Sequence, residues 1–149
     1  SEWPVADEAH AREQAIVASE ASVLFVLGRG FHFGIAHEAA LKLMECALLL
    51  SKPFSIADFA HGPIALVGPE TAALLFGPDA KDLTAKEVRT RTEAAGCKLL
   101  QAPVQPNLPE ELRPLPAAMF GQLVAWHAAR ERRMNPDNPR NLSKVTRTR

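Results

Sequence analysis

Three charged residues in an otherwise apolar stretch have the spacing to act on one substrate. Residues 35–50 are predicted to form a helix, and Glu38, Lys42 and Glu45 interrupt its mostly apolar side chains. At about 100° per residue, Glu38 and Glu45 point within about 20° of one another, with Lys42 between them. Charges on the buried face of such a helix are costly unless they are paired or used. A carboxylate held there beside a lysine suits proton transfer, because burial and partner together tune its pKa.

The same three residues also have a simpler interpretation. Glu38 and Lys42 form an i,i+4 pair and Lys42 and Glu45 an i,i+3 pair, each of which stabilises an exposed helix by about 0.2–0.5 kcal/mol. The apolar neighbours leave little polar face and favour a functional site. The residues alone leave both interpretations open.

A glycine turn, Gly28-Arg29-Gly30, precedes this helix and follows an apolar run at residues 22–28. A turn at a helix N-terminus offers backbone N–H groups to an anion or a sugar hydroxyl. The alternative is a tight strand-to-helix turn without a ligand. A nicotinamide or flavin fingerprint does not fit, because the third glycine, Gly34, comes one place late.

Three further residues, His61, Cys46 and Cys97, carry side chains that could react. His61 opens the turn His61-Gly62-Pro63, where an imidazole that titrates near neutral pH suits proton transfer to a sugar ring oxygen. A single histidine in a turn is as often structural. Both cysteines have apolar neighbours and are expected to be buried and free. We predict no metal site and no cofactor.

Composition narrows the function classes. The 149 residues, 47% of them hydrophobic, fit one domain with a normal core. The 17 basic and 17 acidic residues cancel, which argues against a nucleic-acid or membrane-surface binder. We see neither a signal peptide nor an apolar run long enough to span a bilayer, and we expect a cytoplasmic protein. Basic residues crowd residues 130–149, where we expect a solvated tail.

Apolar runs alternate with periodic segments, and this alternation predicts an α/β fold. The expected strands are residues 22–28, 53–57, 72–77 and 97–102. The expected helices are residues 6–18, 35–50, 81–95 (stopping at Gly96) and 116–133 (starting at Pro116), with a proline-rich loop at 103–116. Such an order implies right-handed βαβ units and a three-layer, doubly wound parallel sheet flanked by helices. Ligands in such sheets bind at the carboxyl ends of the strands.

Four motifs together resemble a known family. They are LGRG at residues 27–30, EAALKLME at 38–45, HGPIALV at 61–67 and PRNLSK at 139–144. The chain resembles the sugar isomerase (SIS) domain, specifically the C-terminal one of the two in the glucosamine-6-phosphate synthase family and its glutaminase-free relatives. The resemblance implies a flavodoxin-like SIS domain over residues 1–133 and a tail, residues 134–149, that carries the last motif.

The resemblance implies aldose–ketose isomerisation of a hexose or aminohexose 6-phosphate, fructose 6-phosphate and glucosamine 6-phosphate, in a synthase or a deaminase. Glu45 matches the general base that moves a proton between C1 and C2. Lys42 matches the lysine that settles the charge of the reacting oxygens. His61 matches the ring-opening histidine, which in the family serves the neighbouring subunit, so a homodimer is implied. Lys144 matches the tail lysine proposed to form an imine with the ketose carbonyl.

The remaining matched positions, namely Gly28, Arg29, Gly30, Glu38 and Ser143, are expected to help bind the substrate. The Ser/Thr-rich loop with which the family's first SIS domain holds the sugar phosphate has no counterpart here, so we expect half of an active site, completed by pairing with a first SIS domain or in a homodimer. Two alternatives remain: a non-catalytic sugar-phosphate-binding or regulatory SIS domain, and a structural half-domain that works only by pairing.

Overall fold

A four-stranded parallel sheet forms the centre of the computed structural model, which describes residues 7–77 and 81–142. Its strands are β1 (Val23–Gly28), β2 (Ser51–Ser55), β3 (Thr71–Phe76) and β4 (Lys98–Gln101), in the order β2-β1-β3-β4. All three strand pairings are parallel. The chain leaves β1 for β2 on one side and later crosses to β3 on the other. The topological switch point therefore lies between β1 and β3.

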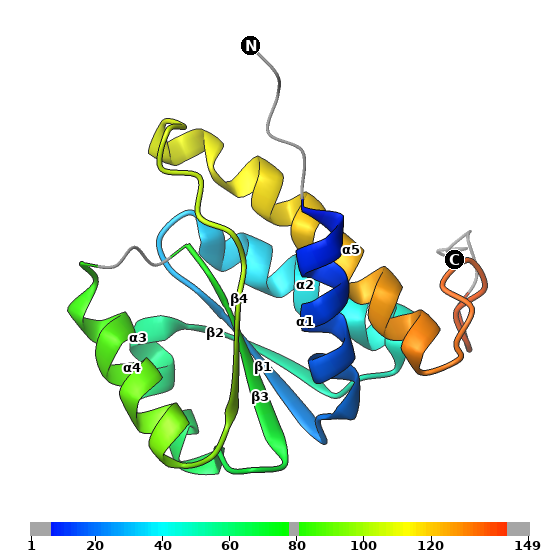
Figure 1. The fold of residues 1–149 in the computed structure, drawn as a ribbon, viewed down its shortest axis with the longest axis horizontal. Coiled ribbons are helices and arrows are strands. Elements are labelled where there is room, and N and C mark those ends of the chain that lie inside the picture. The colour runs from blue at the N-terminus through cyan, green and yellow to red at the C-terminus, as the bar shows by residue number, and fades with distance from the viewer. Residues whose placement is uncertain (1–6, 78–80, 143–149) are drawn as a thin grey trace, which may run out of the picture.

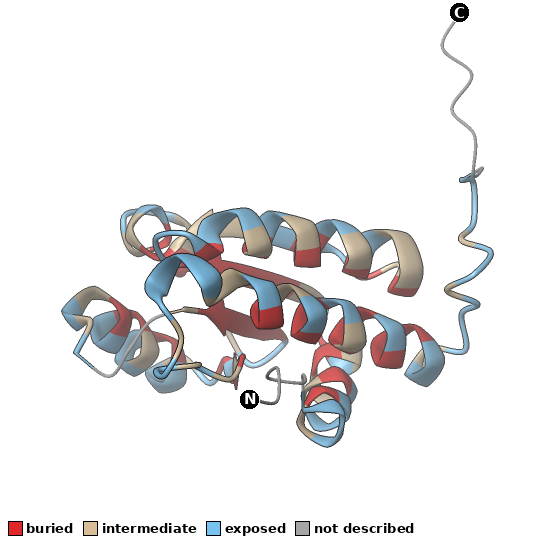
Figure 2. Ribbon diagram, turned by 90° about the horizontal axis from the view of Figure 1, so that it is seen from above, coloured by how far each residue is buried: buried red, intermediate tan, exposed pale blue. Residues whose placement is uncertain are grey.

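Helices cover both faces of the sheet, as predicted (Figure 1). The helices α1 (Glu8–Glu20), α2 (His32–Ala47) and α5 (Pro114–Glu131) lie on one face. The other face carries α3 (Ile56–Ala60), a 3₁₀ turn (Pro63–Leu66) and α4 (Leu83–Ala94). A second 3₁₀ turn spans Glu110–Leu112. Buried residues of the helices face the sheet, and β1 and β3 are buried almost throughout (Figure 2). These layers confirm the predicted three-layer α/β class.

Alternation along the strands divides the core between the two faces. On β1, Leu24 and Val26 pack with the α1, α2 and α5 layer, whereas Phe25 and Leu27 pack with α3 and α4. Continuous apolar runs were therefore the correct signal for the two central strands. The edge strands β2 and β4 are only partly buried.

Several predicted boundaries were wrong. The helix predicted at 35–50 is α2, which ends at Ala47, because Leu48 takes a left-handed conformation and the Leu49 N–H bonds back to the Leu43 carbonyl at 3.2 Å. The helix predicted from Pro116 starts at Pro114, and the predicted loop 103–116 contains the 3₁₀ turn Glu110–Leu112.

Helix α3 was missed, because the strand predicted at 53–57 in fact spans Ser51–Ser55. Ser55 caps the helix: its hydroxyl accepts from the Asp58 N–H at 3.0 Å and donates to the Asp58 carboxylate at 2.6 Å. A serine three residues before an acidic residue is a helix-start signal that could have identified α3.

The C-terminal basic run is not simply a solvated tail. Arg130 and Arg132 lie at the end of α5, where the Arg130 guanidinium stacks 4.8 Å from the Trp126 ring. Arg132 donates from Nη1 to the Ser19 carbonyl at 3.0 Å and so joins α5 to α1. This part of the prediction was wrong, because long cationic side chains also pack against neighbouring elements.

Candidate functional site

Helix α2 carries the predicted proton-transfer residues, and its close approach to β1 fixes where they lie. Gly28 ends β1, and a Cβ at that position would lie 2.5 Å from the His32 carbonyl oxygen and 2.6 Å from the Phe33 Cα. Only a residue without a side chain allows the first turn of α2 to sit there. The structure therefore gives Gly28, which was predicted to bind substrate, a role in packing.

The charges of α2 do not lie on its buried face, contrary to the premise of the sequence argument. The residues that face the sheet and α5 are Ala36, Ala39, Ala40, Leu43 and Ala47. Leu43 lies about 140–160° around the helix from Glu38 and Glu45. The side chains of Glu38, Lys42 and Glu45 are 41%, 35% and 29% exposed. The prediction failed because a helix that is apolar nearly all round gives little contrast between its faces.

A compact ion-pair cluster joins the three side chains. The Lys42 Nζ donates to the Glu45 Oε2 at 2.8 Å and lies 3.9 Å from the Glu38 Oε1. The hydrogen bond to Glu45 is the main reason that the pKa of Lys42 lies above its ordinary value. Lys42 is therefore an ammonium ion at neutral pH, held against a carboxylate that solvent reaches. In this arrangement Glu45 can accept a proton, and the Lys42 ammonium can stabilise negative charge on a bound molecule.

Two exposed apolar side chains of α2 lie next in sequence to these charges. Leu41 and Met44 are 43% and 38% exposed. A helix that has apolar side chains on two sides usually packs against other elements on both of them. The outward face of α2 (Glu38, Leu41, Lys42, Met44 and Glu45) is therefore the surface where a further element would complete a site.

Neither of the two cysteines is a reactive thiolate. Cys97 is buried and Cys46 is half-buried beside Lys42; both thiols are free. Burial raises the pKa of both thiols above the ordinary value, so neither is a thiolate at neutral pH. The expectation of buried, free cysteines holds for Cys97 and in part for Cys46.

His61 does not meet the charges of α2 in this chain. It is exposed at the C-terminal end of α3, on the opposite face of the sheet from α2 (Figure 1). Its backbone N–H bonds to the Asp58 carbonyl at 3.2 Å. Ser143 and Lys144, predicted for substrate binding and catalysis, lie outside the described residues.

A second feature, the switch-point crevice, lies where β1 and β3 end. It has a volume of about 590 Å³, and its lining includes Arg29, Gly30, His32, Gly77, Asp82 and Arg113. Arg29 and Gly30 were predicted to bind substrate. His32, Asp82 and Arg113 were missed. Asp82 carried a usable signal, because an aspartate before a periodic segment is a common N-cap.

The crevice and the outward charges of α2 are separate. His32 and Glu45 lie at opposite ends of α2, about 20 Å apart at 1.5 Å per residue. The structure thus divides the predicted site residues of this chain between two places.

Within residues 7–77 and 81–142, no group of three or more His, Cys, Asp or Glu side chains is placed to hold a metal ion. None of the helices in the described part of the chain combines the length and apolar character that crossing a bilayer requires.

Because the imidazole of His32 is buried, we expect it to make the stability of the fold depend on pH. The pKa of His32 lies below its ordinary value of 6.5, chiefly because burial disfavours the imidazolium and further because of the nearby Arg113 charge. The unfolded chain therefore binds more protons than the folded chain below about pH 6.5. His32 contributes stability that is fully present above that pH and is lost as pH falls through the lowered pKa.

Urea unfolding at about pH 5.5 and about pH 7.5 checks this prediction. The loss of unfolding free energy on acidification should be smaller in His32→Asn than in the wild type. A matched variant at the exposed His37, His37→Asn, should keep the wild-type loss. Equal losses in the wild type and His32→Asn would contradict it.

Comparisons with known proteins extend these observations. No protein-family model matches the chain. The glutamine–fructose-6-phosphate aminotransferase of Bartonella quintana is 33% identical over 135 residues, which cover 79% of this chain and 22% of that protein. The enzyme of the same name from Pyrococcus horikoshii is 31% identical over 149 residues, 89% of this chain and 25% of that protein.

Among solved structures, the glucosamine-6-phosphate deaminase of Thermotoga maritima matches with a TM-score of 0.77 and 25% identity, over 93% of this chain and 45% of that one. This chain spans about a quarter of the length of the two aminotransferases. It is a sugar isomerase (SIS) domain, homologous to that part of the glutamine–fructose-6-phosphate aminotransferases.

Proposed function

We propose that this chain is the isomerase half of an aminosugar-phosphate enzyme. The reaction couples aldose–ketose isomerisation of a hexose 6-phosphate to the gain or loss of an amino group: a synthase combines fructose 6-phosphate with ammonia to give glucosamine 6-phosphate and water, and a deaminase runs the reverse. One observation carries the proposal: the Lys42–Glu45 pair, at 2.8 Å, is partly exposed on the outward face of α2. The names of the homologues and of the structural neighbour, an aminotransferase and a deaminase of the same sugar phosphate, support this substrate class.

The chemistry follows from the two side chains. Glu45, as a carboxylate, removes a proton from the carbon next to the carbonyl and returns it to the neighbouring carbon, so C1 and C2 exchange oxidation levels. Lys42, as an ammonium ion, stabilises the negative charge that develops on the sugar oxygens during the transfer. Glu38 holds Lys42 from the other side and positions it.

Two further residues take part in this proposal through the family resemblance. His61 opens the sugar ring, and its position on the other face of the sheet from α2 supports a role in a neighbouring subunit. Lys144 forms an imine with the ketose carbonyl. Gly28, Arg29, Gly30 and Ser143 bind substrate.

The site works only when another domain covers the outward face of α2. The exposed Leu41 and Met44 beside the charges support a packed partner there. The partner is a first SIS domain, which brings the phosphate-binding loop, and the assembly is a cytoplasmic homodimer. Within the chain, residues 1–133 form the domain and residues 134–149 the tail.

The assay uses the protein expressed from its whole gene, with glucosamine 6-phosphate and fructose 6-phosphate as substrates. A synthase is expected to form glucosamine 6-phosphate from fructose 6-phosphate when ammonia or glutamine is supplied, and a deaminase to form fructose 6-phosphate and ammonia from glucosamine 6-phosphate and water. Saturable binding of these sugars by calorimetry without any interconversion would contradict the enzyme and favour a regulatory domain instead. Absence of both binding and turnover would contradict both functions.

A further inference from the structure

A row of exposed side chains runs along the outward side of α5, the helix that packs against both α1 and α2. The exposed residues recur every three or four positions, which places them on one side of the helix. These residues form the α5 stripe: Leu115, Met119, Gln122, Trp126 and Arg130. The three apolar members are 48%, 42% and 39% exposed. Large apolar side chains gathered on one exposed helix face indicate a contact with another protein surface.

An apolar groove of about 470 Å³ follows the α5 stripe on the side of α1. Met119, Gln122, Leu123 and Trp126 line it from α5, and Glu8 lines it from the start of α1. The Glu8 side chain is 70% exposed, so its charge remains in water at the rim of the groove. The groove therefore suits apolar side chains of a partner.

The two ends of the stripe carry opposite charges. Glu111 is exposed in the 3₁₀ turn just before α5, and Arg130 lies in the last turn of the helix. The Arg130 guanidinium stacks on the Trp126 ring at 4.8 Å. Among the residues that the structure describes, neither Glu111 nor Arg130 forms an ion pair. Both charges are therefore available to a charge on another molecule.

The stripe is complementary to itself when two copies of α5 run antiparallel. A two-fold axis midway between positions 120 and 121 places position 111 opposite 130, 115 opposite 126, and 119 opposite 122. Leu115 then packs on Trp126 of the second copy, and Glu111 meets Arg130 of the second copy. Each of these contacts occurs twice, because a two-fold interface uses the same surface on both chains.

The charges also select the direction of the pairing. Parallel copies of α5 would place the two Glu111 carboxylates together at one end and the two Arg130 guanidinium groups together at the other. Like charges brought together at an interface repel and disfavour that arrangement. Only the antiparallel pairing joins opposite charges at both ends.

The middle of the stripe also fits this pairing. Met119 of the second copy lies opposite Gln122, where the groove can receive its side chain. The two copies of Gln122 lie next to the axis, so the Nε2 of each amide can donate to the Oε1 of the other. The pairing therefore buries no amide without a hydrogen-bond partner.

We infer that the α5 stripe is a contact between two copies of this chain, which pack their α5 helices antiparallel around a two-fold axis. This contact is separate from those of the proposed function, in which a first SIS domain covers the outward face of α2 and His61 serves a neighbour from the other face of the sheet. It does not rest on the proposed function, because a chain without turnover would still associate through α5.

Analytical ultracentrifugation of the 149-residue chain tests the contact. A reversible monomer–dimer equilibrium with a Kd below about 1 mM is expected. Met119→Glu buries a charge in the contact and should weaken association about a hundredfold, while the exposure of Met119 in the monomer preserves the fold. Leu83→Glu is the matched control. Leu83 is 80% exposed on α4, on the other face of the sheet, and its replacement should leave the Kd unchanged.

Charge reversal tests the antiparallel register. Glu111→Arg and Arg130→Glu should each weaken self-association at least about tenfold, because like charges then meet at both ends of the contact. An equimolar mixture of the two variants should associate about as tightly as the wild type, since every pair then joins an arginine to a glutamate. Recovery in the mixture would also show that both variants are folded.

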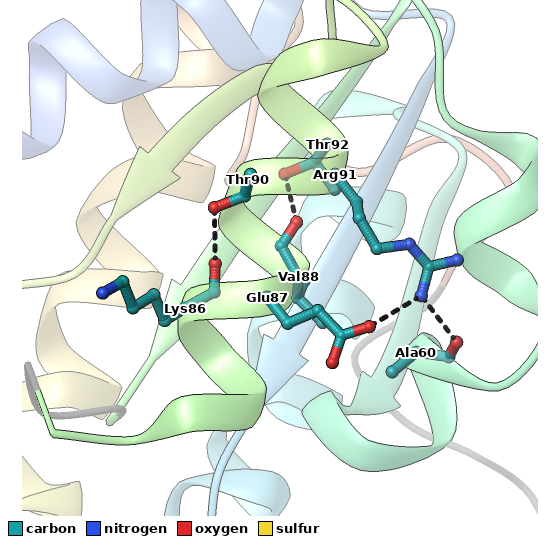
Figure 3. Close-up of polar contacts among 7 residues, drawn as sticks. All are labelled: Ala60, Lys86, Glu87, Val88, Thr90, Arg91 and Thr92. Carbon is teal, nitrogen blue, oxygen red and sulfur yellow. Dashed lines mark hydrogen bonds and ion pairs between the residues drawn. The ribbon is translucent and has the colours of Figure 1, made fainter.

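Arg91→Glu is the control for charge reversal on a helix outside the contact. In α4 the Arg91 Nη1 donates to the Glu87 carboxylate and to the Ala60 carbonyl, each at 3.3 Å (Figure 3). These groups lie on the other face of the sheet from α5. This variant should associate as tightly as the wild type.

Three results would overturn the inference. The first is a wild-type chain that stays monomeric up to about 1 mM. The second is unchanged association of Met119→Glu, which would place the contact on another surface. The third is a mixture of Glu111→Arg and Arg130→Glu that associates no more tightly than either variant alone, which would exclude the antiparallel pairing.

Discussion

Replacing Glu45 with glutamine is expected to lower kcat for hexose 6-phosphate isomerisation by about 10²- to 10⁴-fold and to leave KM nearly unchanged. Glutamine has the size of glutamate but cannot accept the proton. Because Glu45 is the main cause of the raised pKa of Lys42, the same change also lowers that pKa. Both effects act on the transition state more than on substrate binding. Steady-state kinetics on the protein expressed from its whole gene measure the change.

Glu20→Gln is the matched control for this variant. Glu20 also forms a lysine pair, with its Oε2 3.0 Å from the Lys98 Nζ, but on the surface between α1 and β4. The Glu20→Gln variant should keep the wild-type kcat and KM. If Glu45→Gln kept its activity, or if both variants lost it equally, Glu45 would not be the base.

The second large effect is expected from Gly28→Ala, which should destabilise the fold by about 2–3 kcal/mol. The added Cβ would lie 2.5 Å from the His32 carbonyl oxygen and 2.6 Å from the Phe33 Cα, both in the backbone of α2. Neither atom belongs to a flexible side chain, so the first turn of α2 must move. Chemical denaturation followed by circular dichroism measures the loss of unfolding free energy.

Gly34→Ala serves as the control for the added methyl group. Gly34 is an exposed residue of α2, and a Cβ there would meet nothing within 4 Å. This substitution should stabilise the protein by about 0.5–1 kcal/mol, because alanine favours helices over glycine. Similar stability of Gly28→Ala and the wild type would show that the close approach of α2 to β1 is not required.

The central strands could be predicted because their signal is local. Residues such as Leu24 and Phe25 are buried on opposite faces, and this is why the whole run reads as apolar. Helix ends were less predictable, since they depend on caps. Leu48 in a left-handed conformation ends α2 without a glycine to mark it. The Ser55–Asp58 cap was local and readable, but it was overlooked.

The candidate site was predicted in part. The spacing of Lys42 and Glu45 along one helix fixes their contact, and the structure has it at 2.8 Å. The face on which they lie depends on what α2 packs against, and this is set by α5 and the sheet. The crevice could not be predicted from local sequence, because Arg29 and Arg113 are far apart in the sequence and only the folded chain brings them to one crevice.

Solvent hydrogen exchange into the substrate tests the central claim most directly, that Glu45 moves a proton between C1 and C2. The protein expressed from its whole gene is incubated with fructose 6-phosphate in D₂O, and deuterium is followed by NMR. With the wild type we predict deuterium at C1 of the ketose and at C2 of the aldose, and with Glu45→Gln we predict none above background. Exchange at an equal rate in Glu45→Gln, or no exchange with the wild type during turnover, would contradict the account.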